Sequence, residues 1–294
     1  MKALLLVLAV SLVLGGGYRT SAAELNTSLI EQQTGLKGTM QEPGVFQVSY
    51  PRKDLHPVVA GVHMTPPMGL TAWCSFQQAG DHVMAMGDIV LTEDQVASVM
   101  DTALANGLDV TALHNHFFWD SPKIMFMHIS GMGTEATVTS AVGKVFAKLR
   151  ETSAKKQGVP IANIDPAKSK LDTSEIDTIL AAKGRLTDGV YKVTIGRKTT
   201  MARVDIGKAM GVSTWAAFAG TDGQAVVDGD FAMLESEVQS VLKALRHAGI
   251  NIVAIHNHMT GEDPRMVFLH YWGIGKATSL AQGVKAALDS QQLK

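Results

Sequence analysis

Cysteine is nearly absent from this chain: Cys74 is the only one among 294 residues. It cannot form an internal disulfide, so the hydrophobic core rather than a cross-link must stabilise the fold, and we expect Cys74 to be buried and inert. An excess of charge of either sign is also missing, since 26 basic residues face 27 acidic ones. A chain without a basic face is a poor nucleic-acid binder, which leaves a metal ion or a small molecule as the expected partner.

Long apolar runs are equally scarce. The N-terminal run, Ala3–Leu14, is shorter than the roughly 20 residues that a membrane-spanning helix needs, so we expect no stable membrane anchor. It follows Lys2 and precedes a polar stretch that ends in Ser21-Ala22-Ala23, a pattern typical of a secretory signal peptide. We therefore expect a signal peptide over residues 1–23 and an exported protein, periplasmic or secreted. The sequence carries no signal for an oligomeric state.

An internal repeat is the most informative feature that is present. Gapless alignment of Gly87–Gly133 with Gly229–Gly275 gives 16 identities in 47 positions, so the two copies have drifted far apart. A repeat of this length indicates two similar structural units. We expect a first repeat over residues 24–150, an exposed connector over 151–170 and a second repeat over 171–294.

Hydrophobic periodicity predicts the same elements in both copies. The expected helices are 26–37, 92–106 and 134–150 in the first copy and 172–183, 234–248 and 276–290 in the second. The expected strands are 45–50, 72–76, 82–90, 109–116 and 123–130, then 190–195, 214–218, 224–232, 251–258 and 265–272. Thr92 and Gln95 form a capping box, and Gly107 ends that helix. This order predicts an α+β fold of two pseudo-symmetric repeats, each a mainly antiparallel sheet with helices on one side.

Three histidines are among the few residues that both copies retain: His114, His116 and His128 recur as His256, His258 and His270. In a strand, His114 and His116 face the same way, and a turn centred on Ser121 places His128 directly opposite His114. Three neutral imidazoles in one triangle make an open zinc site. We predict one divalent metal site in each repeat, with zinc as the first choice and copper as the alternative. A structural role on a half-buried sheet is the competing interpretation.

Other retained charges are weaker candidates. Asp88, Glu93, Asp230 and Glu235 are candidate acid–base residues, although a carboxylate in a first helical turn is also explained by the helix dipole. Lys123 and Arg265 are placed to hold an anion near the metal. His82 aligns with Gln224, so we expect a structural role for it. Most of the 15 methionines sit among apolar residues, so we expect core packing rather than copper binding.

The pattern GD…E-V…AIHNHM…P-R…F-L-H-Y-W-G-x-G, found at Gly229–Gly275, resembles the LppY/LpqO family of exported bacterial proteins, a domain of unknown function. The resemblance covers almost the whole chain after residue 23 and implies no established reaction. The first copy departs from the pattern at Trp119 and Ile129-Ser130. We therefore expect the second site to bind metal more tightly, with Tyr271-Trp272 enclosing it.

The histidine hairpin is also similar to the zinc-binding hairpin of acetolactate decarboxylase, with one more residue before the third histidine. That similarity implies a metal-dependent lyase or hydrolase acting on a small acidic substrate. A module that binds a non-metal ligand through the histidines is the third alternative.

Overall fold

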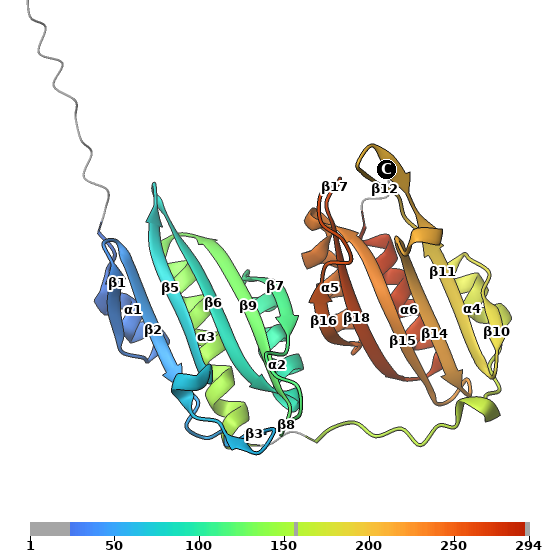
Figure 1. Cartoon of the computed structure of the whole chain (residues 1–294), viewed down its shortest axis with the longest axis horizontal. Coiled ribbons are helices and arrows are strands. Elements are labelled where there is room, and N and C mark those ends of the chain that lie inside the picture. The colour runs from blue at the N-terminus through green and yellow to red at the C-terminus, as the bar shows by residue number, and fades with distance from the viewer. Residues whose placement is uncertain (1–23, 156–157, 292–294) are drawn as a thin grey trace, which may run out of the picture.

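The structure, a computed structural model, describes residues 24–155 and 158–291; the expected signal peptide, residues 1–23, lies outside them. The described residues form six α-helices and one twelve-stranded antiparallel sheet, with two small three-stranded sheets beside it. The helices cover one face of the large sheet in both halves (Figure 1). The predicted α+β class with two pseudo-symmetric repeats is confirmed. No helix within the described residues is long and apolar enough to span a membrane.

The two halves contain corresponding elements in the same order. The first consists of α1 (Thr27–Thr34), β1 (Gly38–Glu42), β2 (Val45–Pro51), β5 (Thr71–Ala79), β6 (His82–Thr92), α2 (Glu93–Ala105), β7 (Asp109–His114), β9 (Ile124–Gly133) and α3 (Glu135–Ala154). The second consists of α4 (Thr173–Leu180), β10 (Arg185–Thr187), β11 (Val190–Gly196), β14 (Ser213–Gly220), β15 (Ala225–Leu234), α5 (Val238–His247), β16 (Asn251–His256), β18 (Met266–Gly275) and α6 (Ala277–Asp289). Shorter strands interrupt both series: β3 (Val58–Val59), β4 (Val62–His63), β8 (Asp120–Ser121), β12 (Thr199–Met201), β13 (Val204–Ile206) and β17 (Glu262–Asp263).

The strand order of the large sheet shows how the repeats are related. It runs β1-β2-β5-β6-β9-β7-β16-β18-β15-β14-β11-β10, so each strand of one repeat has its counterpart at the mirrored position. At the centre, β7 pairs antiparallel with β16, and Leu113 lies opposite Ile255. These two residues are equivalents in the repeat, so a pseudo-two-fold axis passes between them. The hairpin tips at β8 and β17 consequently lie at opposite ends along the strand direction, β8 at the bottom of Figure 1 and β17 at the top.

Several predicted boundaries need correction. The helix expected over 26–37 ends at Thr34, and the chain then forms β1, an edge strand that periodicity did not indicate. The helix expected over 134–150 continues to Ala154. The capping box is present as predicted, because the side chain of Gln95 accepts a hydrogen bond from the amide of Thr92 at 3.0 Å. Cys74 is buried as expected, and burial raises the pKa of its thiol.

The two faces of the sheet have different surroundings. A Cβ at Gly133 would lie 3.4 Å from Val138 of α3, and one at Gly273 would lie 2.9 Å from Leu280 of α6. These glycines therefore face the helices, and alternate residues of the same strands, among them His128 and His270, face the other way. We call this second surface the open face.

In the second repeat, one excursion of the chain covers part of the open face. Between β11 and β14 the chain forms β12 and β13, and from this excursion Ile206 and Val212 pack against Ala232 and Phe268. All four residues are less than 9% exposed. The small apolar cluster lies beside the strands that carry the histidines, so it restricts solvent on one side of them.

Candidate metal centre

Strand pairing sets the positions of the histidines, and it differs from the prediction. His128 lies opposite Ala112 of β7, and His114 lies opposite Phe126 of β9. His128 is therefore displaced by two residues from the predicted place opposite His114. A β-bulge between Val110 and Ala112 accompanies this register. Because side chains alternate with a period of two, a two-residue displacement keeps His128 and His114 on the same face.

The second repeat has the same pairing. His270 lies opposite Ala254, and His256 lies opposite Phe268. A second correction applies to both copies: β7 ends at His114 and β16 ends at His256, so His116 and His258 lie in the following loops rather than in strands. His258 is held by ring stacking on Phe268, with centroids 3.6 Å apart and planes at 10°.

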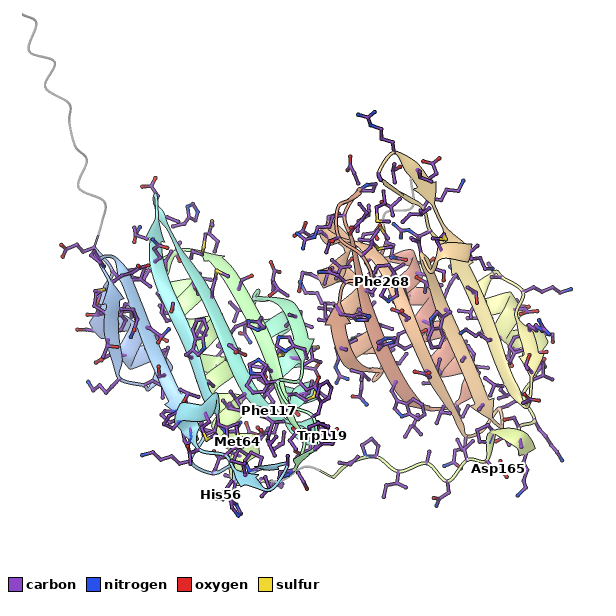
Figure 2. All side chains as sticks on the ribbon, viewed as in Figure 1. His56, Met64, Phe117, Trp119, Asp165 and Phe268 are labelled. Carbon is purple, nitrogen blue, oxygen red and sulfur yellow. The ribbon has the colours of Figure 1, made fainter. Side chains whose placement is uncertain are left out.

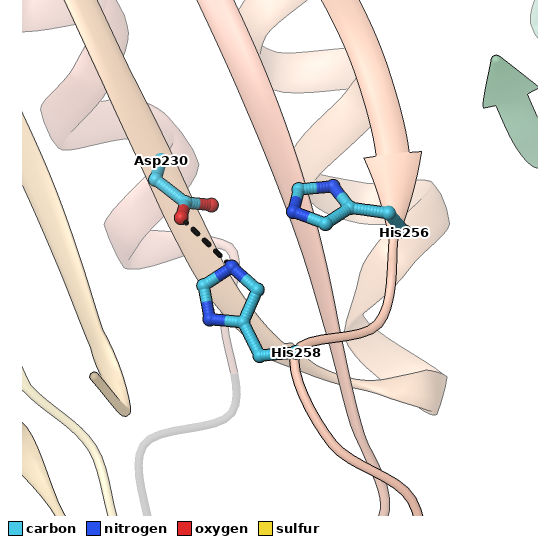
Figure 3. Close-up of side chains that lie close together, drawn as sticks. All are labelled: Asp230, His256 and His258. Carbon is cyan, nitrogen blue, oxygen red and sulfur yellow. Dashed lines mark ion pairs between the residues drawn. The ribbon is translucent and has the colours of Figure 1, made fainter. Parts of the chain in front are cut away.

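Three side chains of the second repeat form a compact group of metal-ligating atoms. Asp230 of β15, His256 at the end of β16 and His258 of the loop each place one ligand atom within 4.8 Å of the other two (Figure 3). His258 Nε2 lies 3.3 Å from Asp230 Oδ2. Two imidazoles and one carboxylate are a donor set that zinc and other divalent ions accept.

Unsatisfied polar atoms point to the same group. Asp230 is 3% exposed, and its Oδ1 has no hydrogen-bond partner among the described residues. His256 Nδ1 is also buried without a partner. A buried polar atom left without a hydrogen bond costs about 1–3 kcal/mol, and a bound cation would remove this cost.

The protonation states favour metal binding by the histidines. Burial lowers the pKa of His256, and the neighbouring His270 and His258 act in the same direction. Burial also lowers the pKa of His258, against a hydrogen bond with the backbone of Gly211. Burial raises the pKa of Asp230 to about 6, although His270 opposes the shift. Neutral imidazoles are the form that binds metal, so no proton has to leave the histidines at neutral pH.

His270 lies beside this group. Its ring stacks on His256, with centroids 4.8 Å apart, and it lies directly opposite Asp230 in the ladder between β15 and β18. Its Nδ1 is 3.4 Å from the carbonyl oxygen of Gly229. The tight group therefore contains Asp230 in the place where the sequence predicted a third histidine, and His270 stays a predicted ligand.

The first repeat gathers the equivalent residues more loosely. The ring centroid of His114 lies 5.2 Å from that of His116 and 5.1 Å from that of His128. Asp88 lies opposite His128, and its pKa is raised by burial, against the charges of the three histidines. Asp88 Oδ1, like Asp230 Oδ1, is buried and has no hydrogen-bond partner in the part of the chain that the structure describes. Within the two described ranges, however, only the second repeat brings three ligand atoms within 4.8 Å of one another.

Two tandem stretches, residues 28–148 and 174–290, match the model of a family described as Domain of Unknown Function (DUF1259). The chain belongs to this family. Its two DUF1259 domains carry one histidine hairpin each, which establishes the internal repeat on independent grounds. The narrower LppY/LpqO assignment stays a prediction, as do the boundaries at residues 150 and 171.

Other comparisons add little to this assignment. A search of curated proteins gives no match. Among solved structures, the chain is similar to a trimeric bacterial microcompartment shell protein, PduB, at 12% identity and a TM-score of 0.21. That match covers 88% of this chain and 91% of the other. A score this low does not constrain the fold or the site.

The remaining candidate residues of the DUF1259 domains are Glu93, Glu235, Lys123 and Arg265. Glu93 is at the start of α2, where it lines a cavity of about 410 Å³ between α2 and the beginning of β16, and this cavity has none of the six histidines in its wall. Glu235 is exposed in a short turn before α5. Lys123 forms an ion pair with Asp120 at 2.6 Å. Arg265 is exposed. The structure does not test a catalytic role for Glu93 or Glu235, or an anion-binding role for Lys123 or Arg265. Those roles stay predictions.

One expectation about the second site is wrong. Tyr271 does not enclose the site, because it alternates with His270 along β18 and faces the helices, fully buried. Its hydroxyl donates to the carbonyl oxygen of Trp215 at 3.0 Å. A Cβ at Gly229 would lie 2.1 Å from the end of the Tyr271 ring, so only glycine fits there. Of the predicted pair, only Trp272 lies on the open face.

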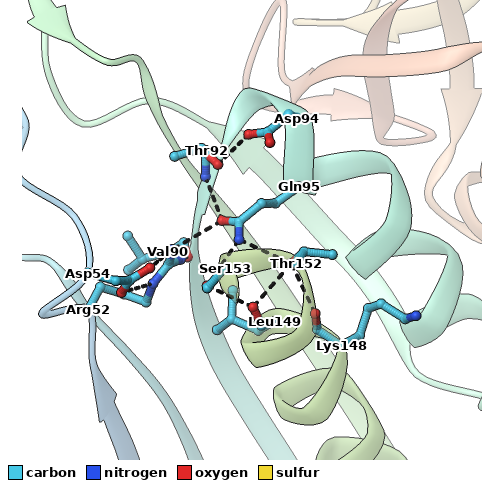
Figure 4. A network of polar contacts seen from close by, with 10 residues as sticks. All are labelled: Arg52, Asp54, Val90, Thr92, Asp94, Gln95, Lys148, Leu149, Thr152 and Ser153. Atoms are coloured by element: carbon cyan, nitrogen blue, oxygen red, sulfur yellow. Dashed lines mark hydrogen bonds and ion pairs between the residues drawn. The ribbon is translucent and has the colours of Figure 1, made fainter. Parts of the chain in front are cut away.

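Sequence reasoning missed a buried polar network in each repeat. Arg52 is fully buried; it donates to the carbonyl oxygen of Val90 and binds Asp54 at 2.8 Å and Gln95 at 3.2 Å (Figure 4). It recurs as Arg197, which pairs with Glu237 at 3.1 Å. The signal in the sequence was this recurrence of arginine just after the strand expected over 45–50 and its counterpart.

Proposed function

We propose that this protein binds a divalent metal ion in its second repeat through Asp230, His256 and His258, with His270 as a further donor. The observation that supports this most directly is the convergence of three ligand atoms from three separate segments within 4.8 Å. Two of these residues also carry buried atoms without a hydrogen-bond partner in the described structure.

Zinc is the ion we expect first. Imidazole nitrogen and carboxylate oxygen both ligate zinc at about 2.0–2.2 Å, and sites with three protein ligands keep a fourth position open. The same donors also accept copper and iron(II), so the identity of the ion has to come from measurement. In the first repeat, His114, His116 and His128, with Asp88 beside them, are proposed as a second and weaker site.

The test is a calorimetric titration of the EDTA-treated chain with zinc, and in parallel with copper(II) and iron(II). His258→Ala should abolish binding at the second repeat, because it removes a ligand rather than core volume. His247→Ala is the matched control, since His247 is an exposed histidine at the end of α5, outside both clusters. If His258→Ala and His116→Ala both bind metal as the parent does, the histidines serve another ligand and the metal proposal is wrong.

A metal-dependent lyase or hydrolase acting on a small acidic substrate is the second candidate function. It is favoured by a cation beside the proposed metal ligands. Lys192 Nζ lies 3.7 Å from the ring centroid of Trp215, and Trp215 lies directly opposite Asp230 in the sheet. An anionic substrate bound to the metal would therefore meet Lys192. Binding of small dicarboxylates to the zinc-loaded protein should weaken in Lys192→Gln; equal binding would argue for a metal-binding protein without this activity.

We further propose that the protein is exported and loses residues 1–23. The support is the charged, apolar and small-residue order of that segment. Mass spectrometry of the protein from the periplasm or medium should give a chain that begins at Glu24. An intact N-terminus in a cytoplasmic fraction would contradict this proposal.

A further inference from the structure

Three methionines gather on the open face of the first repeat, at the end of the sheet away from the histidine hairpin tip. Met132 of β9 lies between Gly131 and Gly133, which face Leu108 and Val138 on the helix side. Met132 therefore faces the open side. Met84 of β6 is directly opposite Met132 in the ladder.

The third methionine and a histidine follow by alternation along β6. Met86 is two residues after Met84, and His82 is two residues before it, so all three side chains share one face. The residues between them, Val83 and Ala85, are 1% and 2% exposed and fill the core on the helix side. Val83 and Ala85 therefore pack this part of β6 against the helices, and the core does not need the side chains of His82, Met84 and Met86.

Two of these methionines are exposed and Met84 is half-buried, so they are not core residues as the sequence led us to expect. Met86 is 57% exposed and Met132 is 60% exposed. Figure 2 shows side chains along this whole surface of the first repeat. Methionine exposed in this way gains little from burial, so core packing does not explain why Met86 and Met132 stand beside Met84.

The second repeat provides an internal comparison. At the positions of Met84, Met86 and Met132 it has Val226, Asp228 and Ile274. At the position of His82 it has Gln224. The same strands therefore fold without any of the four side chains, so the fold does not require sulfur or imidazole here.

The spacing allows the three methionine sulfurs to reach one ion. Directly opposed residues such as Met84 and Met132 have Cβ atoms about 4.5–5.5 Å apart, and diagonal neighbours are about 7–8 Å apart. Met86 lies roughly 6.6 Å along the strand from Met84, whereas His82 lies roughly 13 Å from Met86, too far for these two side chains to share one ion. The methionine side chain has three rotatable bonds and a polarisable thioether, so its sulfur can move several ångströms toward a shared centre.

We propose that Met84, Met86 and Met132 form a binding site for a soft monovalent cation, copper(I). Thioether sulfur is a soft, uncharged donor that selects copper(I) over magnesium, calcium or zinc. The site is separate from the Asp230, His256 and His258 group in residues, in repeat and in donor chemistry.

The test uses the whole metal-free chain without oxygen. Copper(I) is titrated in competition with bicinchoninate, a chromophoric copper(I) chelator, for the parent and for Met84→Leu/Met86→Leu/Met132→Leu. Leucine keeps the apolar volume and removes the sulfur. The triple variant should bind more than about 100-fold more weakly, because even outer-shell partners of a metal are worth about 10–100-fold. The control is Met40→Leu/Met210→Leu, two exposed methionines outside the cluster, and it should match the parent.

A second measurement separates this site from the histidine clusters. His256→Ala/His258→Ala should keep copper(I) binding, whatever happens to zinc at the second repeat. In carbon-13 methyl spectra, silver(I) should shift three methionine methyl signals together, and these signals should be the ones missing from the triple variant. A parent that does not compete with bicinchoninate overturns the proposal. So does a triple variant that binds copper(I) as tightly as the parent, since the ion would then be held by His114, His116 and His128.

Discussion

Asp230→Asn should make the metal-free protein more stable and should abolish its stabilisation by zinc. Burial raises the pKa of Asp230 from its ordinary 3.8 to about 6. One pKa unit corresponds to about 1.4 kcal/mol, so the ionised carboxylate destabilises the metal-free fold by up to roughly 3 kcal/mol at neutral pH. Asparagine keeps the shape without the charge. Because the amide is also buried, we expect a gain of about 1–3 kcal/mol.

The sign of the pH dependence follows from the raised pKa. The folded state binds the proton of Asp230 more tightly than the unfolded state does, so this contribution to stability is greatest below pH 3.8 and declines until about pH 6. The parent and Asp230→Asn should therefore have similar stability near pH 3 and should differ most above about pH 6.

Urea unfolding at several pH values, with EDTA or with zinc, checks both parts of this prediction. Zinc at about 100 times its dissociation constant should stabilise the parent by about 2.7 kcal/mol and the variant by much less. Asp88→Asn is the matched variant in the first repeat, where burial raises the pKa of Asp88 as well. Asp88→Asn should also be more stable than the parent in EDTA. Its stabilisation by zinc at the second repeat should equal that of the parent. If Asp230→Asn is less stable than the parent in EDTA at pH 8, or if zinc stabilises both equally, the reasoning fails.

Further substitutions test the packing around the sites. Arg52→Met removes a fully buried guanidinium and leaves its acceptors unpaired, so urea unfolding should show a loss of about 3–5 kcal/mol. Gly229→Ala forces a Cβ within 2.1 Å of the Tyr271 ring, which should cost about 1–3 kcal/mol and lower the melting temperature. Tyr271→Phe loses one buried hydrogen bond and should cost about 1 kcal/mol in the same melts. Burial opposes ionisation of Asp120, but hydrogen bonds from Lys123 and a backbone amide hold its pKa below the ordinary 3.8. The ionised Asp120 therefore stabilises the fold at neutral pH, and this contribution is lost as the pH falls through the lowered pKa. Asp120→Asn should destabilise the protein by about 1 kcal/mol at pH 7 but not at about pH 2. Unfolding measured at both pH values checks this.

The sequence alone was sufficient for the repeat, the α+β class and the gathering of the histidines on one face. Alternation places His128 on the same face as His114 in any register that differs by an even number of residues. The capping box of α2 was equally local, because Thr92 and Gln95 are only three residues apart. Such features depend on contacts between residues close together in the chain. The number of residues between two side chains is enough to predict these contacts.

The tertiary structure decided which side chains meet. The hairpin is centred on Asp120 rather than on Ser121, so His114 lies opposite Phe126, and no residue pattern in the turn revealed this register. Asp230 joins His256 and His258 only because β15 pairs with the far side of β18, a contact between segments more than 25 residues apart in sequence. Its position beside these two histidines makes the carboxylate a candidate ligand.

The difference between the repeats has the same origin. Both carry the three histidines and the aspartate, yet only the second brings three ligand atoms within 4.8 Å among the described residues. The methionines of β6 and β9 likewise looked like core residues until strand pairing placed Met84 beside Met132 on the face without helices. A linear sequence specifies which side chains share a face of one strand, because that depends on alternation. Which strands lie next to each other depends on long-range pairing, and that pairing determined the composition of both proposed sites.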